Sequence, residues 1–247
     1  MKVLKFGGTS VGSARRMKNV ASIIGSSERK IVVLSAMSGT TNALVCIAGC
    51  FYRKAPDEAN KMISEQEQKY AREIEALYRT DLYKERALQL VTEHFNHVWS
   101  FSGKPFTVFD EKVILAQGEL ISTGMMDLYL QEQGIESVLL PALNFMRITA
   151  DGEPDPVYIR EKLVALLDQH PDTSVFITQG FICRNAYGDI DNLQRGGSDY
   201  SASLIGAAVD AEEIQIWTDI DGMHNNDPRV VNHTSPVRQV NFEEAAK

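Results

Sequence analysis

The sequence predicts an α/β fold in which helices cover both faces of a mainly parallel sheet. Three observations point to it: a β-prone run at residues 2–6 ends in two glycines, a helical pattern begins at Ser13, and a continuous aliphatic run follows at residues 31–34. Strands buried on both faces of a parallel sheet are apolar throughout, as residues 31–34 are. A strand, a helix and a second parallel strand in this order require a right-handed crossover.

The next two stretches differ in character. In the first helix, four apolar residues fall on one face, as in a helix packed on a sheet: Met17, Val20, Ala21 and Ile24. Residues 56–99 are instead rich in Glu, Gln and Lys and contain neither Gly nor Pro after Pro56. Their apolar positions recur at helical spacing. We therefore predict a helical insertion at about residues 55–104 within a single domain that covers residues 1–247.

Beyond Pro105 the alternation of helices and strands resumes. We predict helices at residues 111–131, 157–169 and 198–209, strands at 137–140, 174–178 and 213–218, and a polar, glycine-containing connection at 180–193. Leu163, Leu166 and Leu167 would face inward from the second of these helices. Residues 241–247 begin like a helix and stop, and so short a helix is marginal unless it is packed. We therefore expect the domain to be incomplete at its C-terminus.

The composition excludes several classes of protein. The chain has 247 residues, 44% of them hydrophobic and 23% charged, which is enough to bury a sizeable core. A formal net charge of -8 argues against a nucleic-acid partner, because such proteins carry a basic face that contacts phosphates. No apolar run approaches the roughly 18 residues of a membrane span, and the N-terminus lacks the apolar core of a signal peptide. We therefore predict a cytoplasmic protein without a membrane partner.

The cysteines and histidines give no metal-site pattern. Three cysteines are too few and too irregularly spaced for a disulfide framework or a four-cysteine zinc site. Cys46 and Cys50 are four residues apart, which suits either a metal clip or two small core residues, and we expect the second. His94 and His97 have no third ligand nearby in the sequence and are interpreted as surface or packing residues. We predict no protein ligand for a metal.

The first candidate for chemistry is KFGGTS at residues 5–10. Here Lys5 closes a strand, and two glycines allow a tight turn towards a helix N-terminus. Free N–H groups and the helix dipole then converge on a position that suits an anion. The motif is not a Walker A loop, because Ser13 stands where that loop requires lysine. The alternative is a simple strand-to-helix turn with an exposed lysine.

The second candidate is RGGSD at residues 195–199, after a polar loop and at the start of a helix. Its backbone amides form another anion cradle, and Arg195 has the planar group that grips a carboxylate through two hydrogen bonds. Asp199 has two interpretations. It is either catalytic or an ordinary N-terminal helix acid that complements the dipole.

The third candidate is WTDIDG at residues 217–222, followed by DPR at residues 227–229. The motif follows an aliphatic strand, and ligands of open α/β sheets sit at strand ends. An EF-hand is excluded because the twelfth position counted from Asp219 is Val230 rather than glutamate. A nucleotide site and a solvated Asp-Gly turn both remain open.

Together, seven blocks resemble the aspartate kinases of the amino acid kinase family in content and order, over essentially the whole chain. They are KFGGTSV at residues 5–11, VLSAMSGTTN at 33–42, GE at 118–119, QGF at 179–181, RGGSDYSA at 195–202, WTDIDG at 217–222 and DPR at 227–229. The helical stretch is similar to an insertion of the longer, feedback-regulated bacterial members, including those fused to homoserine dehydrogenase.

The resemblance implies a three-layer α/β/α sandwich, the amino acid kinase fold, and transfer of the γ-phosphoryl group of MgATP to the β-carboxylate of L-aspartate. This is the first step of lysine, threonine and methionine biosynthesis. By similarity, Lys5 and Asp199 are catalytic, Glu119 pairs with the α-ammonium group and Arg195 with the α-carboxylate. The implied aspartate-binding residues are Ser35, Thr41, Glu119, Phe181, Arg195, Gly196, Gly197 and Ser198. The implied nucleotide-binding residues are Lys5, Gly7, Gly8, Thr9, Ser10, Thr218, Asp219, His224 and Arg229.

The chain also departs from the family pattern. His224 stands where tyrosine is common, which leaves the detail of purine binding open. An FGAKVLHP-like block with a further phosphate-contacting lysine and the regulatory ACT domains do not occur, so we expect this polypeptide to be weak or inactive and the full-length protein to be a homo-oligomer. Two alternatives are a related kinase for glutamate, acetylglutamate or a nucleotide, and a non-catalytic nucleotide-binding module. The blocks at 33–42 and 195–199 oppose the first, and joint retention of Lys5, Glu119, Arg195 and Asp199 opposes the second.

Overall fold

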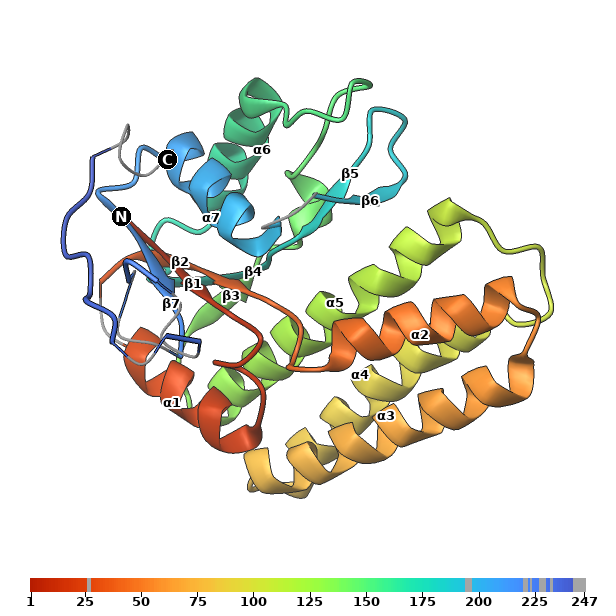
Figure 1. Ribbon diagram of the computed structural model, residues 1–247. Helices are drawn as coiled ribbons and strands as arrows, with labels where there is room; N and C mark the ends of the chain where they lie inside the picture. Colours follow the sequence, from red (N-terminus) through yellow and green to blue (C-terminus); the bar gives the residue numbers. More distant parts are fainter. Residues whose placement is uncertain are drawn as a thin grey trace. The chain divides into compact units, whose positions relative to one another are not determined.

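The computed structural model describes residues 1–25, 28–193, 197–219, 222, 224–226, 230–231 and 233–241. The chain forms two compact units, Met1–Trp217 and Thr218–Lys247. The first unit contains a five-stranded sheet with the strand order β3-β4-β2-β1-β7, and all neighbouring strands are parallel (Figure 1). Its strands are β1 (Lys2–Phe6), β2 (Lys30–Leu34), β3 (Ser137–Leu139), β4 (Val175–Gln179) and β7 (Glu213–Trp217).

The register of the sheet brings several strand ends to one edge. Phe6, the last residue of β1, pairs with Leu34 of β2 and with Trp217 of β7, and Leu34 pairs with Gln179 of β4. Since all these strands run in the same direction, the turns that follow Phe6, Leu34 and Gln179 emerge side by side. This edge is where open α/β sheets bind their ligands.

Helices cover both faces of the sheet, as the alternation of side chains along β1 requires. Leu4 and Phe6 belong to one buried cluster and Val3 to the other. The helices α1 (Ala14–Ile24) and α5 (Val108–Glu132) contribute to the first cluster. The helices α6 (Pro156–Asp168) and α7 (Gly197–Ala208) contribute to the second, with a short 3-10 helix, η1 (Ala142–Asn144). The predicted α/β layering is confirmed.

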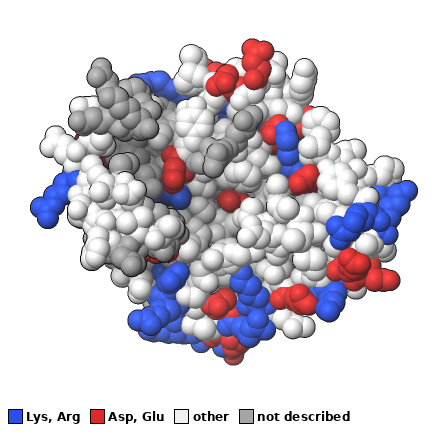
Figure 2. Space-filling model, in the orientation of Figure 1, with Lys and Arg blue, Asp and Glu red and all other residues white. Residues whose placement is uncertain are grey.

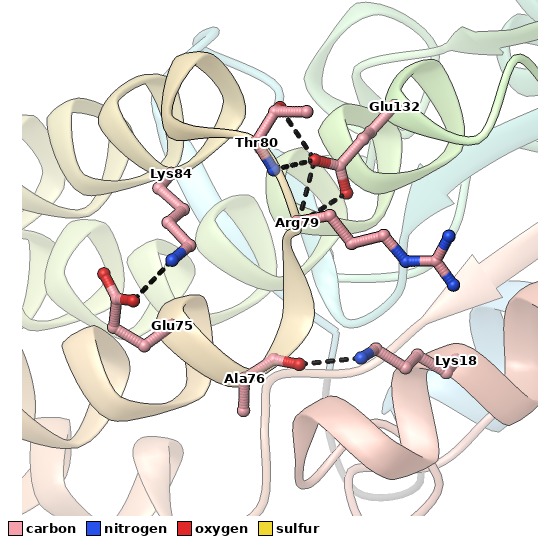
Figure 3. Close-up of polar contacts among 7 residues, drawn as sticks. All are labelled: Lys18, Glu75, Ala76, Arg79, Thr80, Lys84 and Glu132. Atoms are coloured by element: carbon pink, nitrogen blue, oxygen red, sulfur yellow. Dashed lines mark hydrogen bonds and ion pairs between the residues drawn. The ribbon is translucent and has the colours of Figure 1, made fainter.

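Three further helices extend away from the sheet: α2 (Thr40–Tyr52) and α4 (Asp81–Trp99) pack against α5, and α3 (Pro56–Leu77) packs against α2 and α4 (Figure 1). The connection between α3 and α4 is fastened by the Glu132 carboxylate at the end of α5, which accepts hydrogen bonds from the backbone N–H groups of Arg79 and Thr80 at 2.8–3.1 Å (Figure 3). The helical character predicted for residues 56–99 is therefore present, and its status as an insertion stays a prediction.

Most predicted elements match, and the differences are local. The sequence interpretation contained no helix at α2 and no strands in the connection at 180–193, where β5 (Ile182–Arg184) and β6 (Ile190–Asn192) form an antiparallel hairpin. Cys50 is buried as expected, but Cys46 is exposed, because the buried face of α2 runs through Leu44, Ile47 and Cys50. Leu166 is only half-buried, since Leu163 and Leu167 occupy the inward face of α6.

In the second unit, His224 forms an antiparallel bridge with Pro236, and its Nδ1 lies 2.8 Å from Oγ1 of Thr234. The helix start predicted within residues 241–247 falls almost entirely outside the described residues. Among the helices that the structure describes, none combines the length and apolar character needed to cross a membrane.

Candidate active site

The side chain of Lys5 leaves β1 on the face that α7 covers, because residues alternate between the two faces of a strand. Its Nζ lies 2.7 Å from Oδ1 of Asp199, in the first turn of α7. It also lies over Gly7, where an added Cβ would be 3.4 Å from Nζ. A lysine ammonium, a glycine turn and a helix N-terminus therefore meet at the end of β1.

The turn after β1 is shaped by hydrogen bonds of its own backbone. The N–H groups of Ser10 and Val11 donate to the carbonyl of Gly7, and Ser13 caps α1 by accepting from the N–H of Arg16. Among the described residues, the N–H groups of Gly8 and Thr9 have no acceptor. Unpaired N–H groups beside a lysine form a binding position for an anion such as phosphate.

The turn after β2 packs directly on this first turn. The N–H of Ser38 donates to the carbonyl of Gly8 at 3.1 Å. An added Cβ on Gly8 would lie 2.8 Å from the Ala36 carbonyl oxygen, so only glycine fits there. Gly39 has a φ of 81° and is the N-cap of α2. Its conformation sets the direction of α2 and so the position of Thr41 in the first turn of that helix.

A cavity of about 330 Å³ lies beside these two turns. Figure 2 shows this face of the molecule hollowed near its centre, where isolated acidic and basic side chains lie among uncharged ones. The lining combines residues from the ends of β1, β2 and β4 with the start of α7 and one carboxylate from α5. The lining residues are Gly8, Ser35, Ala36, Met37, Ser38, Gly39, Thr41, Asn42, Glu119, Phe181, Gly197 and Ser198.

Among the described lining residues, Glu119 alone is charged, and it is 3% exposed. Gly118 allows α5 to approach the turn after β2, since an added Cβ would lie 2.9 Å from Cβ of Ala36. Oε1 of Glu119 accepts from the N–H of Ala36 at 3.2 Å, whereas Oε2 is buried without a partner among the described residues. Burial raises the pKa of Glu119 to about 7. A buried, half-satisfied carboxylate in a cavity suits a ligand that donates hydrogen bonds or carries positive charge.

The opposite wall is formed by Phe181 and the start of α7. Phe181 has a φ of 67°, an uncommon conformation for a residue with a side chain, and its N–H donates to Oγ of Ser201. Gly197 packs so closely that an added Cβ would lie 2.5 Å from the Phe181 ring. Ser198 packs equally closely on Gly180. Such strain, held by tight neighbours, is concentrated at functional sites.

The structure brings many of the sequence-predicted residues together. Lys5, Gly7, Gly8, Ser35, Thr41, Glu119, Phe181, Gly197, Ser198 and Asp199 lie around one cavity and one turn. Arg195, Gly196 and Arg229 lie outside the described residues. Thr218, Asp219 and His224 belong to the second unit. The lining residues Ala36, Met37, Ser38, Gly39 and Asn42 were not assigned from the sequence, although they lie inside the singled-out block at residues 33–42.

Within the described part of the chain, no group of three or more His, Cys, Asp or Glu side chains converges on one point. Asp199, at the start of α7, is paired with Lys5.

The fold and the site define a parallel α/β protein with a glycine turn suited to an anion beside a small polar cavity. The chain belongs to the amino acid kinase family, whose model matches residues 1–247.

Three relatives show which members of the family this chain is similar to. Lysine-sensitive aspartokinase 3 of Escherichia coli (strain K12) is 32% identical in an alignment of 252 positions that covers 99% of this chain and 55% of that protein. A chloroplastic bifunctional aspartokinase/homoserine dehydrogenase 2 of Arabidopsis thaliana is 29% identical over 98% of this chain and 27% of its own length. The crystal structure of E. coli aspartokinase III in complex with aspartate and ADP matches with a TM-score of 0.78 and 29% identity, over 96% of this chain and 53% of that one. The chain thus spans about half, or less, of the relatives' lengths.

Proposed function

We propose that this chain is the catalytic part of an aspartate kinase, which transfers the γ-phosphoryl group of ATP to the β-carboxylate of L-aspartate. The observation that carries the proposal is the distribution of charge around the cavity. An unpartnered carboxylate oxygen of Glu119 lies in the lining, and the Lys5 ammonium group lies at the glycine turn. An acceptor with an ammonium group at one end and a carboxylate directed towards a phosphate fits this distribution.

The proposed roles follow from this division. The ionised Glu119 carboxylate binds the α-ammonium group of aspartate, and Thr41, Ser35, Phe181 and Ser198 border the same cavity. Arg195, which precedes α7 in the sequence, is proposed to bind the α-carboxylate through its guanidinium group. The β-carboxylate is then the only charged group of the substrate that is free to react.

In the reaction, a β-carboxylate oxygen forms a bond to the γ-phosphorus, and the bond between that phosphorus and the bridging oxygen of ADP breaks. Such transfer depends on positioning and charge neutralisation rather than on a protein nucleophile. Lys5 neutralises charge on the transferring group, and Asp199 holds the lysine in place through their 2.7 Å ion pair. The N–H groups of Gly8 and Thr9 would bind phosphate oxygens. Mg²⁺, bound to the phosphates, would add further charge neutralisation.

The other nucleotide contacts stay predictions from the sequence: Gly7, Ser10, Thr218, Asp219, His224 and Arg229. Support for ATP as the donor comes from the E. coli relative, whose structure contains ADP and aspartate. Homo-oligomer formation, a cytoplasmic location and a place at the start of lysine, threonine and methionine synthesis are likewise proposed from the resemblance.

The test is a substrate panel with the full-length protein and MgATP, in which hydroxylamine traps any acyl phosphate as a hydroxamate. L-aspartate is expected to give hydroxamate, and L-glutamate, N-acetylglutamate and a nucleoside monophosphate are not. ATP turnover with one of the other acceptors in place of aspartate would assign a different member of the family. Tight ATP binding with no phosphorylated product would indicate a non-catalytic module.

A second arm tests the role of Glu119. Glu119→Gln should raise the KM for aspartate by about 10²-fold and leave the KM for ATP nearly unchanged, because a buried carboxylate that pairs with an ammonium group would be lost. The matched control is Asp127→Asn, an acid two turns further along α5 that accepts hydrogen bonds from Ser137 and Gln131. An equal rise of both KM values in Glu119→Gln would exclude Glu119 as a substrate ligand.

A further inference from the structure

One face of α3 makes polar contacts with both turns that shape the cavity. Tyr70 and Lys69 contact the turn at residues 38–41, and one helical turn further on, Oε2 of Glu73 accepts from the N–H of Ala14 at 2.6 Å. Ala14 is the first residue of α1, directly after the glycine turn that follows β1. None of these three α3 residues lines the cavity, and none belongs to a motif that the sequence singled out.

The contact of Tyr70 is fully buried. Its hydroxyl lies 2.8 Å from Oγ1 of Thr40, and both residues are 0% exposed. Thr40 stands between Gly39 and Thr41, which both line the cavity, and its Cγ2 lies 3.4 Å from an added Cβ on Gly118, the neighbour of Glu119. The Tyr70 hydroxyl therefore holds Thr40, which lies between two residues that line the cavity and beside Gly118 of α5.

Lys69 holds the same turn through its backbone. Its Nζ donates to the backbone carbonyl of Ser38 at 2.6 Å and lies 3.8 Å from an added Cβ on Gly39. Ser38 in turn donates its N–H to the carbonyl of Gly8. The lysine thus fastens Ser38, the residue whose N–H joins the two turns.

We propose that Tyr70 and Lys69 are positioning residues for the acceptor site, and that α3 fixes the turn at residues 38–41 so that Thr41 and Glu119 bind the amino acid together. This proposal rests on the proposed function of the cavity. Neither residue touches the cavity itself, so each acts through the turn. A loosened turn weakens binding of the acceptor more than binding of the nucleotide, whose glycine turn keeps its own hydrogen bonds.

The first test is Tyr70→Phe, which removes one hydroxyl and keeps the ring that packs on Phe95. The matched control is Tyr78→Phe, because Tyr78 at the end of α3 is equally buried and its hydroxyl donates to the backbone carbonyl of Met125, away from the cavity. In the full-length protein, Tyr70→Phe should raise the KM for aspartate about tenfold with little change in the KM for ATP. Tyr78→Phe should change neither KM. Equal KM values for aspartate in the two variants would overturn the proposal.

The second test is Lys69→Met, with Lys18→Met as its control. Lys18 of α1 donates to the backbone carbonyl of Ala76 in α3 at 2.7 Å (Figure 3). Like Lys69, it is a lysine bound to a backbone oxygen, but that oxygen lies near the C-terminal end of α3 and not in the turn at residues 38–41. Lys69→Met should raise the KM for aspartate, and Lys18→Met should not. An unchanged KM for aspartate in Lys69→Met, or an equal rise in Lys18→Met, would show that α3 acts only as a structural support.

Hydrogen exchange measured by mass spectrometry separates this proposal from the proposed function. Amides of residues 35–42 should exchange about tenfold faster in Tyr70→Phe and Lys69→Met than in the two controls, whatever the substrate is. Unchanged exchange in both variants would exclude the positioning role, even if the substrate panel confirms aspartate as the acceptor. Faster exchange together with a substrate panel that gives no hydroxamate from aspartate would support the positioning role and reject the assigned acceptor.

Discussion

The ammonium group of Lys5 lies 2.7 Å from the carboxylate of Asp199, although the two residues belong to opposite ends of the first unit's sequence. The pair joins the glycine turn after β1 to the N-terminus of α7. The glycine turn after β1 and the start of α7 at residues 197–199, which the sequence presents separately, are therefore neighbours. The proposed enzyme requires this proximity, because the glycine turn would hold the phosphates and the start of α7 would border the amino acid.

Lys5→Met should leave the protein folded and lower kcat by about 10²–10³-fold, since one preorganised charge is lost from the transferring group. Lys2→Met is the matched control. Lys2 lies on the same strand and forms ion pairs with Glu28 and Glu213 instead. Steady-state kinetics on the full-length variants, with circular dichroism to check folding, give the comparison. Near-normal kcat in Lys5→Met would remove this lysine from the mechanism.

Glu119 makes stability depend on pH. Its carboxyl group has an ordinary pKa of 4.5 and a pKa of about 7 in the folded protein. Below pH 4.5 this carboxyl group is protonated in both the folded and the unfolded state and does not affect stability. As pH rises between the two values, the unfolded chain ionises first, so the folded state is destabilised by a total on the order of 3 kcal/mol. Urea unfolding at pH 5 and pH 8 should therefore show a smaller loss of stability in Glu119→Gln than in the wild type. Parallel pH profiles for the two proteins would contradict this interpretation.

Gly197→Ala should disturb the wall of the cavity that Phe181 and the start of α7 form. The new methyl group would lie 2.5 Å from the ring of Phe181, and Phe181 has little freedom to move, because its N–H is bonded to Ser201. We expect a lower Tm, by several degrees, and a higher KM for aspartate. Thermal unfolding and aspartate titrations measure the two effects. An unchanged KM would mean that Phe181 does not border the bound substrate.

Gly49→Ala should have the opposite effect on stability. Gly49 lies inside α2, and an added Cβ would meet only the flexible end of Arg53 at 3.3 Å. Replacing glycine by alanine in a helix interior stabilises by about 0.5–1 kcal/mol. The urea midpoint should rise, and kinetic constants should not change. A destabilised variant would show that α2 requires a glycine at this position for close packing.

The fold was predictable where local pattern and tertiary environment agree. The apolar runs of β2 and β4 are buried along their whole length, and the spacing of Met17, Val20 and Ile24 marks the face of α1 that packs on the sheet. The helix α2 was missed because it begins at a glycine with positive φ, contains Gly49 and is apolar on most sides. The hairpin of β5 and β6 was missed because its strands have three residues each, too few to show an alternation.

The site was only partly predictable for a related reason. Lys5, Glu119 and Asp199 stand in recognisable blocks, so the resemblance could assign them. Lys69 and Tyr70 stand in a helix whose sequence shows only helical periodicity, and their importance comes from contacts with residues about 30 positions away, such as Thr40. Such contacts leave no local signal, because nothing in a helical pattern states which neighbour its buried hydroxyl will meet.

The position of β1 inside the sheet, between β2 and β7, has a consequence for how the molecule is made. One of its neighbours, β2, follows within the first 34 residues, but the other, β7, comes from residues 213–217. A chain that leaves the ribosome from its N-terminus carries β1 with one edge unpaired until nearly the whole unit has been translated. Open strand edges of this kind invite pairing with other chains, so nascent polypeptides of this fold are expected to depend on chaperones until their last strand emerges.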